Sequence, residues 1–268
     1  MTALTYGSTQ VRPRALRPLL LVFAIGQVVS PIFSALFGGA FTTADRPGEP
    51  PIVPAGYAFS IWGVVEALSV AWALWSLSDR RPDLELRDRL AAPLLVVFVG
   101  FSVWIVAAEL EPTWLTLVVF LVMLAGLLRA LGLALQARAA IARWSRLGQF
   151  LLWGLLGIYT GWSSIAIWLN LTTALAGSGA PIVGPVAVVA QTAILAGATA
   201  TAVAILRWTG GMLPYALAVA WAFVGAIIGA SGAGQPLLAA AAALGLLVVA
   251  VALVVTRRQQ ARRQTYHR

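Results

Sequence analysis

The sequence predicts an all-α membrane protein, a polytopic bundle of eight transmembrane helices. Of its 268 residues, 60% are hydrophobic and only 10% are charged, whereas a soluble domain carries roughly 25% charged residues. So few charges cannot cover a water-facing surface, and hydrocarbon must therefore be the main solvent. The apolar segments also lack the alternation of apolar and polar residues that the strands of a membrane β-barrel show over about 10 positions.

Composition also bears on the classes of function. The net charge is +9, and every basic residue except His267 is arginine. The arginines lie in short clusters between apolar segments, which is typical of helix anchors and not of a nucleic-acid surface. The chain has no cysteine, and its only histidine is His267. We therefore expect no thiolate metal site and no required cofactor, and we do not predict an enzyme.

Charges and turn residues divide the chain into segments long enough to span a bilayer, which takes about 20 apolar residues. Loops are expected at the Pro- and Gly-rich TTADRPGEPPIVPAG and at the charged SDRRPDLELRDR. Two long charge-free stretches are each interrupted near the middle, by GSGAP at 177–181 and by GASGAGQP at 229–236. The expected helices are 19–41, 57–77, 90–108, 114–136, 148–175, 184–206, 211–230 and 236–256.

The arginines also predict the topology. Cytoplasmic loops of membrane proteins are enriched in Lys and Arg. If the N-terminus is cytoplasmic and eight helices follow, every arginine except Arg46 falls on the cytoplasmic side. We therefore expect a multi-pass protein of the cell membrane with both termini in the cytoplasm. Its first partner is the lipid bilayer, and a homodimer is compatible with the sequence.

Glu66 lies in the middle of the second expected helix. An acidic residue at a helix centre costs about 2.5–3.5 kcal/mol on insertion scales, so it should face the bundle or a water-filled cavity. Phe59, Trp62 and Ser69 share its helix face. Glu66 could contact a ligand or accept a proton; alternatively, it could hydrogen-bond a neighbouring helix and serve packing alone.

The fifth expected helix carries a second such face. Tyr159, Trp162, Ala166 and Asn170 recur at i, i+3, i+7 and i+11. A small residue between aromatic and polar groups lets a helix or a flat ligand approach closely. Helix packing with an interhelical hydrogen bond explains the same pattern, and two further intramembrane amides, Gln27 and Gln191, are expected to join helices in that way.

The 11 tryptophans separate by their place along the helices. Five lie near helix ends, where indoles commonly mark the membrane interface: Trp75, Trp114, Trp144, Trp153 and Trp208. Six lie deeper, where they could stack on a flat ligand or simply pack: Trp62, Trp72, Trp104, Trp162, Trp168 and Trp221.

These residues resemble the TspO/MBR family, also called tryptophan-rich sensory proteins or peripheral benzodiazepine receptor-like proteins. PAGYAFSIWGVV at 54–65 looks like the family's proline-containing first loop and the start of its second helix. SVW at 102–104 and the following TWLTLVVFLVMLAGLLRAL look like its third and fourth helices, and YTGWSSIAIWLN at 159–170 is similar to its fifth-helix signature. LPYALAVAWAFVG at 213–225 looks like the added region of long family variants.

The resemblance implies a division of the chain into a five-helix TspO-like core and three further helices. The expected parts are a cytoplasmic N-terminal segment at 1–18, the core at 19–176, a three-helix extension at 177–256 and a basic cytoplasmic tail at 257–268. Two positions depart from the family pattern: Glu66 stands where Tyr is usual, and Phe101 stands where Asn is usual. Both fall in the implied pocket, so the ligand need not be the family's own.

The resemblance further implies a pocket under the first loop, between the first, second, third and fifth helices. The expected function is a membrane sensory or binding protein for a flat hydrophobic ligand, such as a porphyrin or another tetrapyrrole, or a sterol. The candidate pocket residues are Tyr57, Phe59, Trp62, Glu66, Trp104, Tyr159, Trp162, Ala166 and Asn170. The alternative is a proton-coupled secondary transporter in which Glu66 takes the proton, and metal-free tetrapyrrole breakdown stays open as a third.

Overall fold

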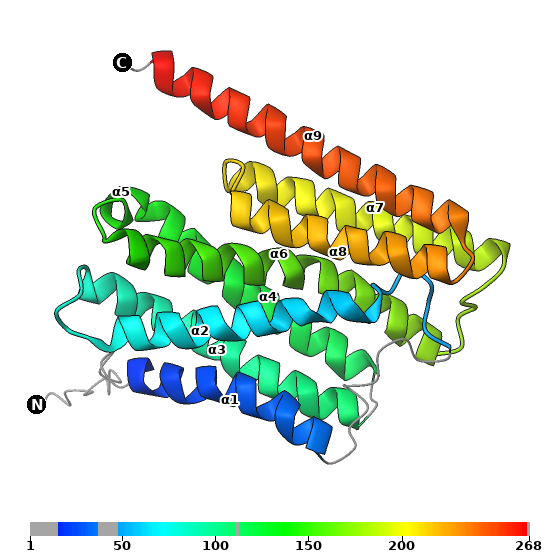
Figure 1. Cartoon of the computed structure of the whole chain (residues 1–268), viewed down its shortest axis with the longest axis horizontal. Coiled ribbons are helices and arrows are strands. Elements are labelled where there is room, and N and C mark those ends of the chain that lie inside the picture. The colour runs from blue at the N-terminus through cyan, green and yellow to red at the C-terminus, as the bar shows by residue number, and fades with distance from the viewer. Residues whose placement is uncertain (1–15, 37–47, 111–112, 267–268) are drawn as a thin grey trace, which may run out of the picture.

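The computed structural model describes residues 16–36, 48–110 and 113–266, and these residues form helices joined by loops (Figure 1). Eight of the described helices are long and apolar enough to cross a membrane, as predicted. The helices are α1 Leu16–Leu36, η3 Gly56–Ser60, α2 Ile61–Leu77, α3 Leu84–Glu109, α4 Thr113–Gln136, α5 Arg138–Ile141, α6 Arg146–Gly177, α7 Pro185–Trp208, α8 Leu213–Gly232 and α9 Pro236–Tyr266.

Two helices run into segments predicted to be non-helical. α3 begins at Leu84 and not near residue 90, so half of the expected charged loop is helical. α9 continues to Tyr266, so the described part of the predicted basic tail is helical too. Arg, Gln and Ala all favour helix, and Arg257 is tied down by a hydrogen bond from its Nε to the carbonyl of Gly211 (3.2 Å).

Two buried arginines explain why charged residues begin α3. Arg87 donates to the carbonyls of Ser76 (2.6 Å), Ser78 (3.0 Å) and Arg81 (2.7 Å). Arg17 on α1 donates to the carbonyls of Ser76 and Leu77, both at 3.0 Å. The last carbonyls of a helix have no partner within the helix. The two guanidinium groups therefore satisfy the end of α2 and fix its position against α1 and α3.

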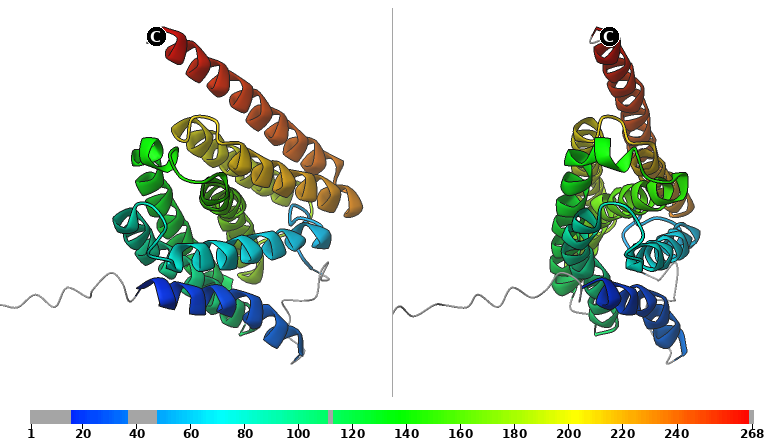
Figure 2. Two further views of the ribbon diagram at one scale, coloured as in Figure 1. Left: turned by 60° about the vertical axis from the view of Figure 1, so that its left-hand side comes forward. Right: turned by 90° about the vertical axis from the view of Figure 1, so that its left-hand side faces the viewer.

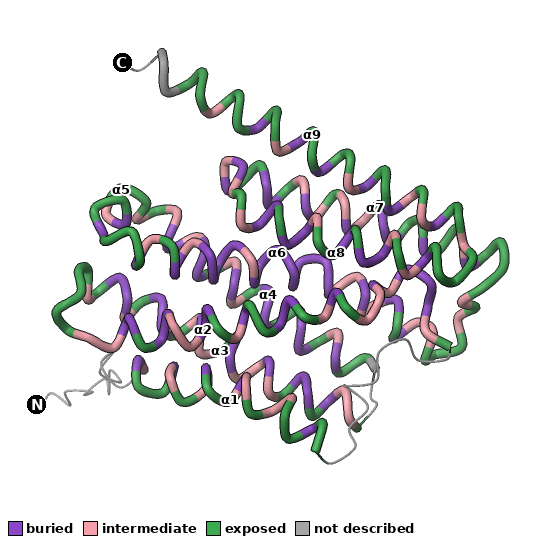
Figure 3. Tube along the Cα trace, viewed as in Figure 1, coloured by how far each residue is buried: buried purple, intermediate pink, exposed green. Residues whose placement is uncertain are grey.

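α6 is the central helix of the bundle. It packs against α2, α4, α7 and α8, whereas α1 packs mainly against α2 and α3, and α9 packs mainly against α7 and α8. Figure 2 shows α1 and α9 at opposite edges of the molecule. Burial follows this arrangement, because α6 is buried along most of its length and α9 is largely exposed (Figure 3). The exposed side chains of the outer helices are mainly apolar, as a lipid-facing surface requires.

Two glycines of α6 allow α8 to approach closely. A Cβ atom at Gly161 would lie 2.6 Å from the carbonyl oxygen of Tyr215 and 2.8 Å from Cβ of Ala218. A Cβ at Gly157 would lie 2.7 Å from Cβ of Pro214. Such small-residue faces let helix backbones come together in membranes. The same contact is fixed by the hydroxyls of Ser164 and Tyr215, which lie 3.0 Å apart.

The close contact between α6 and α8 predicts what a methyl group added at Gly161 would do. Gly161→Ala should destabilise the protein by about 1–3 kcal/mol, because overpacking forces α6 and α8 apart. Gly232→Ala, at the end of α8, is the matched control, since a Cβ there meets nothing within 4 Å. Thermal unfolding in detergent should show a lower midpoint for Gly161→Ala and an unchanged or higher one for the control. Equal midpoints for the two variants would contradict the close contact.

Candidate ligand-binding site

A cavity of about 120 Å³ lies between α2, α3, α4 and α6, at the end where the 48–60 segment crosses the bundle. Six of the nine predicted pocket residues line it: Phe59, Trp62, Trp104, Trp162, Ala166 and Asn170. The remaining lining residues are Glu49, Val53, Phe120, Leu169 and Thr173. The cavity therefore has the expected roof, but α4 takes the place that the prediction gave to the first helix.

Trp62 is the centre of the aromatic wall. Its ring centroid lies 4.8 Å from that of Phe101, 5.5 Å from Trp104 and 6.0 Å from Trp162. Edge-to-face and tilted pairs at these separations are favourable arrangements of aromatic rings. Phe101, which departs from the family pattern, thus packs against Trp62 from behind. The wall is consequently apolar and rigid, and it presents ring faces and edges to the cavity.

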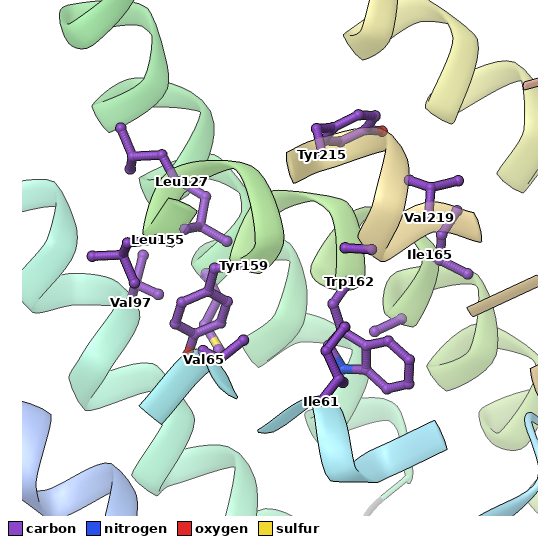
Figure 4. Close-up of a cluster of buried hydrophobic side chains, with 14 of the residues drawn as sticks. Ile61, Val65, Val97, Leu127, Leu155, Tyr159, Trp162, Ile165, Tyr215 and Val219 are labelled. Atoms are coloured by element: carbon purple, nitrogen blue, oxygen red, sulfur yellow. The ribbon is translucent and has the colours of Figure 1, made fainter. Parts of the chain in front are cut away.

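α6 supplies the opposite part of the site. Figure 4 shows Tyr159 and Trp162 extending from α6 toward α2, while Tyr215 and Val219 lie on α8, on the other side of α6. The ring of Trp162 also meets Phe59 edge to face at 5.6 Å. The signature face of α6 therefore turns toward the cavity, and its glycine face turns toward α8.

Polar groups border the aromatic wall. Asn170 donates from Nδ2 to the carbonyl of Ala166 on its own helix (2.9 Å), so its amide is satisfied without a second helix. The indole nitrogens of Trp62 and Trp162 are buried and make no hydrogen bond within the described part of the chain. A buried donor without a partner is costly. These two N–H groups could therefore donate to an acceptor on a ligand.

Three predicted pocket residues lie elsewhere. Tyr57 is 43% exposed and meets Trp221 of α8 edge to face at 5.4 Å. Tyr159 is fully buried behind Trp62, with the two ring centroids 5.8 Å apart. Glu66 is half-buried and is not among the residues that line the cavity. Sequence spacing places Glu66 and Tyr159 on the expected helices, but it does not give the rotation of each helix about its axis; Tyr57 lies in η3, before α2 begins.

Gln27 and Tyr159 form a buried polar pair between α1 and α6. The hydroxyl of Tyr159 donates to Oε1 of Gln27 (3.0 Å). Arg17, near the start of α1, donates to the carbonyl of Ser76, near the end of α2. Gln27 lies ten residues after Arg17 on α1, and Glu66 lies ten residues before Ser76 on α2. The two side chains are therefore at similar depth in the bundle. Nε2 of Gln27 is buried without a partner among the described residues. Gln27 joins two helices, as predicted.

Two tryptophans near helix ends are buried inside the protein. Trp75 and Trp144 lie near the end of α2 and the start of α6, as predicted, but they stack with Trp72 (centroids 5.4 and 6.2 Å from Trp72). Gly148 leaves the space, because a Cβ there would lie 2.4 Å from the Trp75 ring. Trp221 lies in the middle of α8, as predicted; it is partly exposed there and donates to the carbonyl of Ala58 (2.8 Å).

Some lining residues were not predicted. Leu169 and Thr173 extend the α6 face that holds Ala166 and Asn170, and the same helical spacing would have indicated them. Phe120 on α4 has no such signal, because α4 is apolar on every side. Among the described residues, no group of three His, Cys, Asp or Glu side chains could hold a metal ion.

A family model described as TSPO-like protein matches residues 19–255. The match reaches from α1 into α9, so it includes α7, α8 and the greater part of α9 as well as the helices that precede them. No curated protein and no solved structure matches the chain.

The bond between Tyr159 and Gln27 predicts a non-additive pair of substitutions. Tyr159→Phe leaves Oε1 of Gln27 buried without a donor, which should cost about 1–3 kcal/mol. Adding Gln27→Leu should restore part of the loss, since replacing both partners by apolar groups is nearly neutral. Tyr57→Phe removes a hydroxyl from an exposed ring and is the control. Thermal unfolding of the wild type, Tyr159→Phe, Gln27→Leu and the double variant measures the coupling, and strictly additive shifts would rule it out.

Proposed function

The chain belongs to the family of TSPO-like proteins, and from this membership we propose that it is a membrane sensory or binding protein for a flat hydrophobic ligand. A porphyrin or another tetrapyrrole is the proposed ligand class, held in the cavity beside Trp62 and Trp162. The main support for this proposal is that aromatic side chains from η3, α2, α3, α4 and α6 line one cavity. Ligand sites are typically apolar and aromatic, with a few polar groups that fix orientation.

The chemistry of the lining matches a flat conjugated ring system. Indole and phenyl faces would stack on the ring plane. The unpartnered indole N–H groups of Trp62 and Trp162 would donate to acceptors at the ligand edge, and the Asn170 amide lies beside them. Carboxylate or carbonyl substituents are such acceptors. A ligand lacking them should bind more weakly, because the buried donors would stay unsatisfied.

The size of the cavity adds a condition. Pockets for drug-sized ligands measure about 300–1,000 Å³, whereas this cavity measures about 120 Å³. A whole tetrapyrrole therefore requires the cavity to widen. Glu49, Val53 and Phe59 are the lining residues that precede α2. Movement of that segment would widen the cavity without separating the membrane-spanning helices.

A proton-coupled transporter is the second candidate. It is favoured by one observation: the acidic residue Glu66 lies half-buried within a membrane-spanning helix, at the depth of Gln27. Intramembrane acids commonly serve proton relays in carriers. Glu66 stands apart from the aromatic cavity, so substitutions at the two places separate the two functions.

Protoporphyrin binding to the purified protein tests the proposal. Trp62→Ala and Trp162→Ala should each weaken binding about tenfold or more, because each removes a stacking surface and a hydrogen-bond donor. Trp208→Ala is the matched control, since that indole is about half exposed on α7, outside the cavity. Quenching of tryptophan fluorescence and the shift of the porphyrin absorption band report binding.

Three outcomes separate the candidates. Selective loss in Trp62→Ala and Trp162→Ala supports the aromatic cavity as the site. Equal affinity in these variants and in Trp208→Ala would reject it. Substrate flux into vesicles that depends on pH and disappears in Glu66→Gln would favour the transporter instead.

A further inference from the structure

The 48–60 segment that roofs the cavity is packed into the protein. Ile52 and Ala58 are fully buried, and Pro51 and Pro54 are buried beside them. The same segment supplies Glu49, Val53 and Phe59 to the cavity lining. One face of the segment therefore covers the proposed ligand site. The opposite face must pack against another part of the protein. That support comes from α7 and α8, which follow the five helices of the expected core.

The 48–60 segment packs on two glycines of α8, Gly225 and Gly229. A Cβ at Gly225 would lie 2.8 Å from Cβ of both Pro54 and Ala58. A Cβ at Gly229 would lie 2.4 Å from the carbonyl oxygen of Val53. These distances leave no room for a side chain at either glycine, so the roof segment lies directly on the backbone of α8.

Hydrogen bonds also connect the 48–60 segment to α8 and α7. The amide of Ala55 donates to the carbonyl of Gly225 (3.1 Å), and Nε1 of Trp221 donates to the carbonyl of Ala58 (2.8 Å). From α7, Oε1 of Gln191 accepts from the amide of Ile52 (3.3 Å). Backbone outside regular helices must be satisfied by protein wherever lipid replaces water. α7 and α8 provide those partners.

We propose that α7 and α8 keep the aromatic cavity closed, and that Trp221, Gly225, Gly229 and Gln191 are positioning residues that set how readily a molecule enters it. The identity of that molecule rests on the proposed function, but the closure itself does not. α7 and α8 thereby gain a role: they control access to a site formed entirely by earlier parts of the chain. Entry requires the roof segment to leave α8 and to give up the three hydrogen bonds.

The chain has no cysteine, so a single introduced thiol reports access without background. Ala166→Cys places the reporter in the cavity, at a position that is buried in the closed state. Its rate of modification by N-ethylmaleimide is the measurement. Gly229→Ala in this background should raise the rate about tenfold or more, because the added methyl group cannot fit against the Val53 carbonyl and displaces the roof.

Trp221→Phe is the second variant. It keeps an aromatic ring beside Tyr57 and removes the donor to Ala58 together with part of the indole ring, so it adds no atoms against the roof segment, whereas Gly229→Ala does. It should also accelerate labelling of Ala166→Cys, by a smaller factor. Gly232→Ala is the matched control on the same helix, since nothing lies within 4 Å of its Cβ, and it should leave the rate unchanged.

A second reporter distinguishes opening of the roof from loosening of the whole protein. Ala134→Cys is fully buried on α4, fourteen positions from Phe120 and outside the cavity lining. Its labelling should stay slow in Gly229→Ala and Trp221→Phe. Equal acceleration at both reporters, or no acceleration at Ala166→Cys, would overturn the proposal. Because no ligand is used, a failure of protoporphyrin to bind rejects the proposed function and leaves this result standing.

Discussion

The close approach of α8 to its neighbours is the contact on which the rest of the structure depends. On one side, Gly157 and Gly161 of α6 bring α8 against the central helix. On another, Gly225 and Gly229 of α8 receive the 48–60 segment. Between helices in a membrane, van der Waals packing of small residues replaces the hydrophobic effect as the source of association. α8 thus connects the helix that carries the signature residues to the segment that covers them.

Much of the architecture follows from the spacing of charges. Arg146, Arg207 and Arg257 delimit stretches that must each hold two spans, and the structure places paired helices in both. The predicted boundaries fail where charged residues are buried. Arg87 looks like a loop residue by composition, yet its guanidinium caps the end of α2 and belongs to α3. Tertiary contacts decide that position, and a single sequence does not contain them.

The sequence predicted part of the candidate site, as it predicted part of the helix boundaries. Trp162, Ala166 and Asn170 share a helix face by spacing alone, and all three line the cavity. Glu66 and Tyr159 have equally clear spacing but do not line it, because the rotation of each helix about its axis decides which side chains reach the cavity. Gln191 was expected to join helices; it does bond across elements, but to the roof segment.

A crystal structure of the protein with protoporphyrin would test the central claim most directly, that a flat ligand occupies the aromatic cavity once the roof leaves α8. The account predicts a tetrapyrrole ring between Trp62 and Trp162, with the 48–60 segment displaced from Gly225 and Gly229. A tetrapyrrole bound elsewhere on the protein would contradict the site. One bound in the cavity with the amide of Ala55 still donating to Gly225 would contradict the closure.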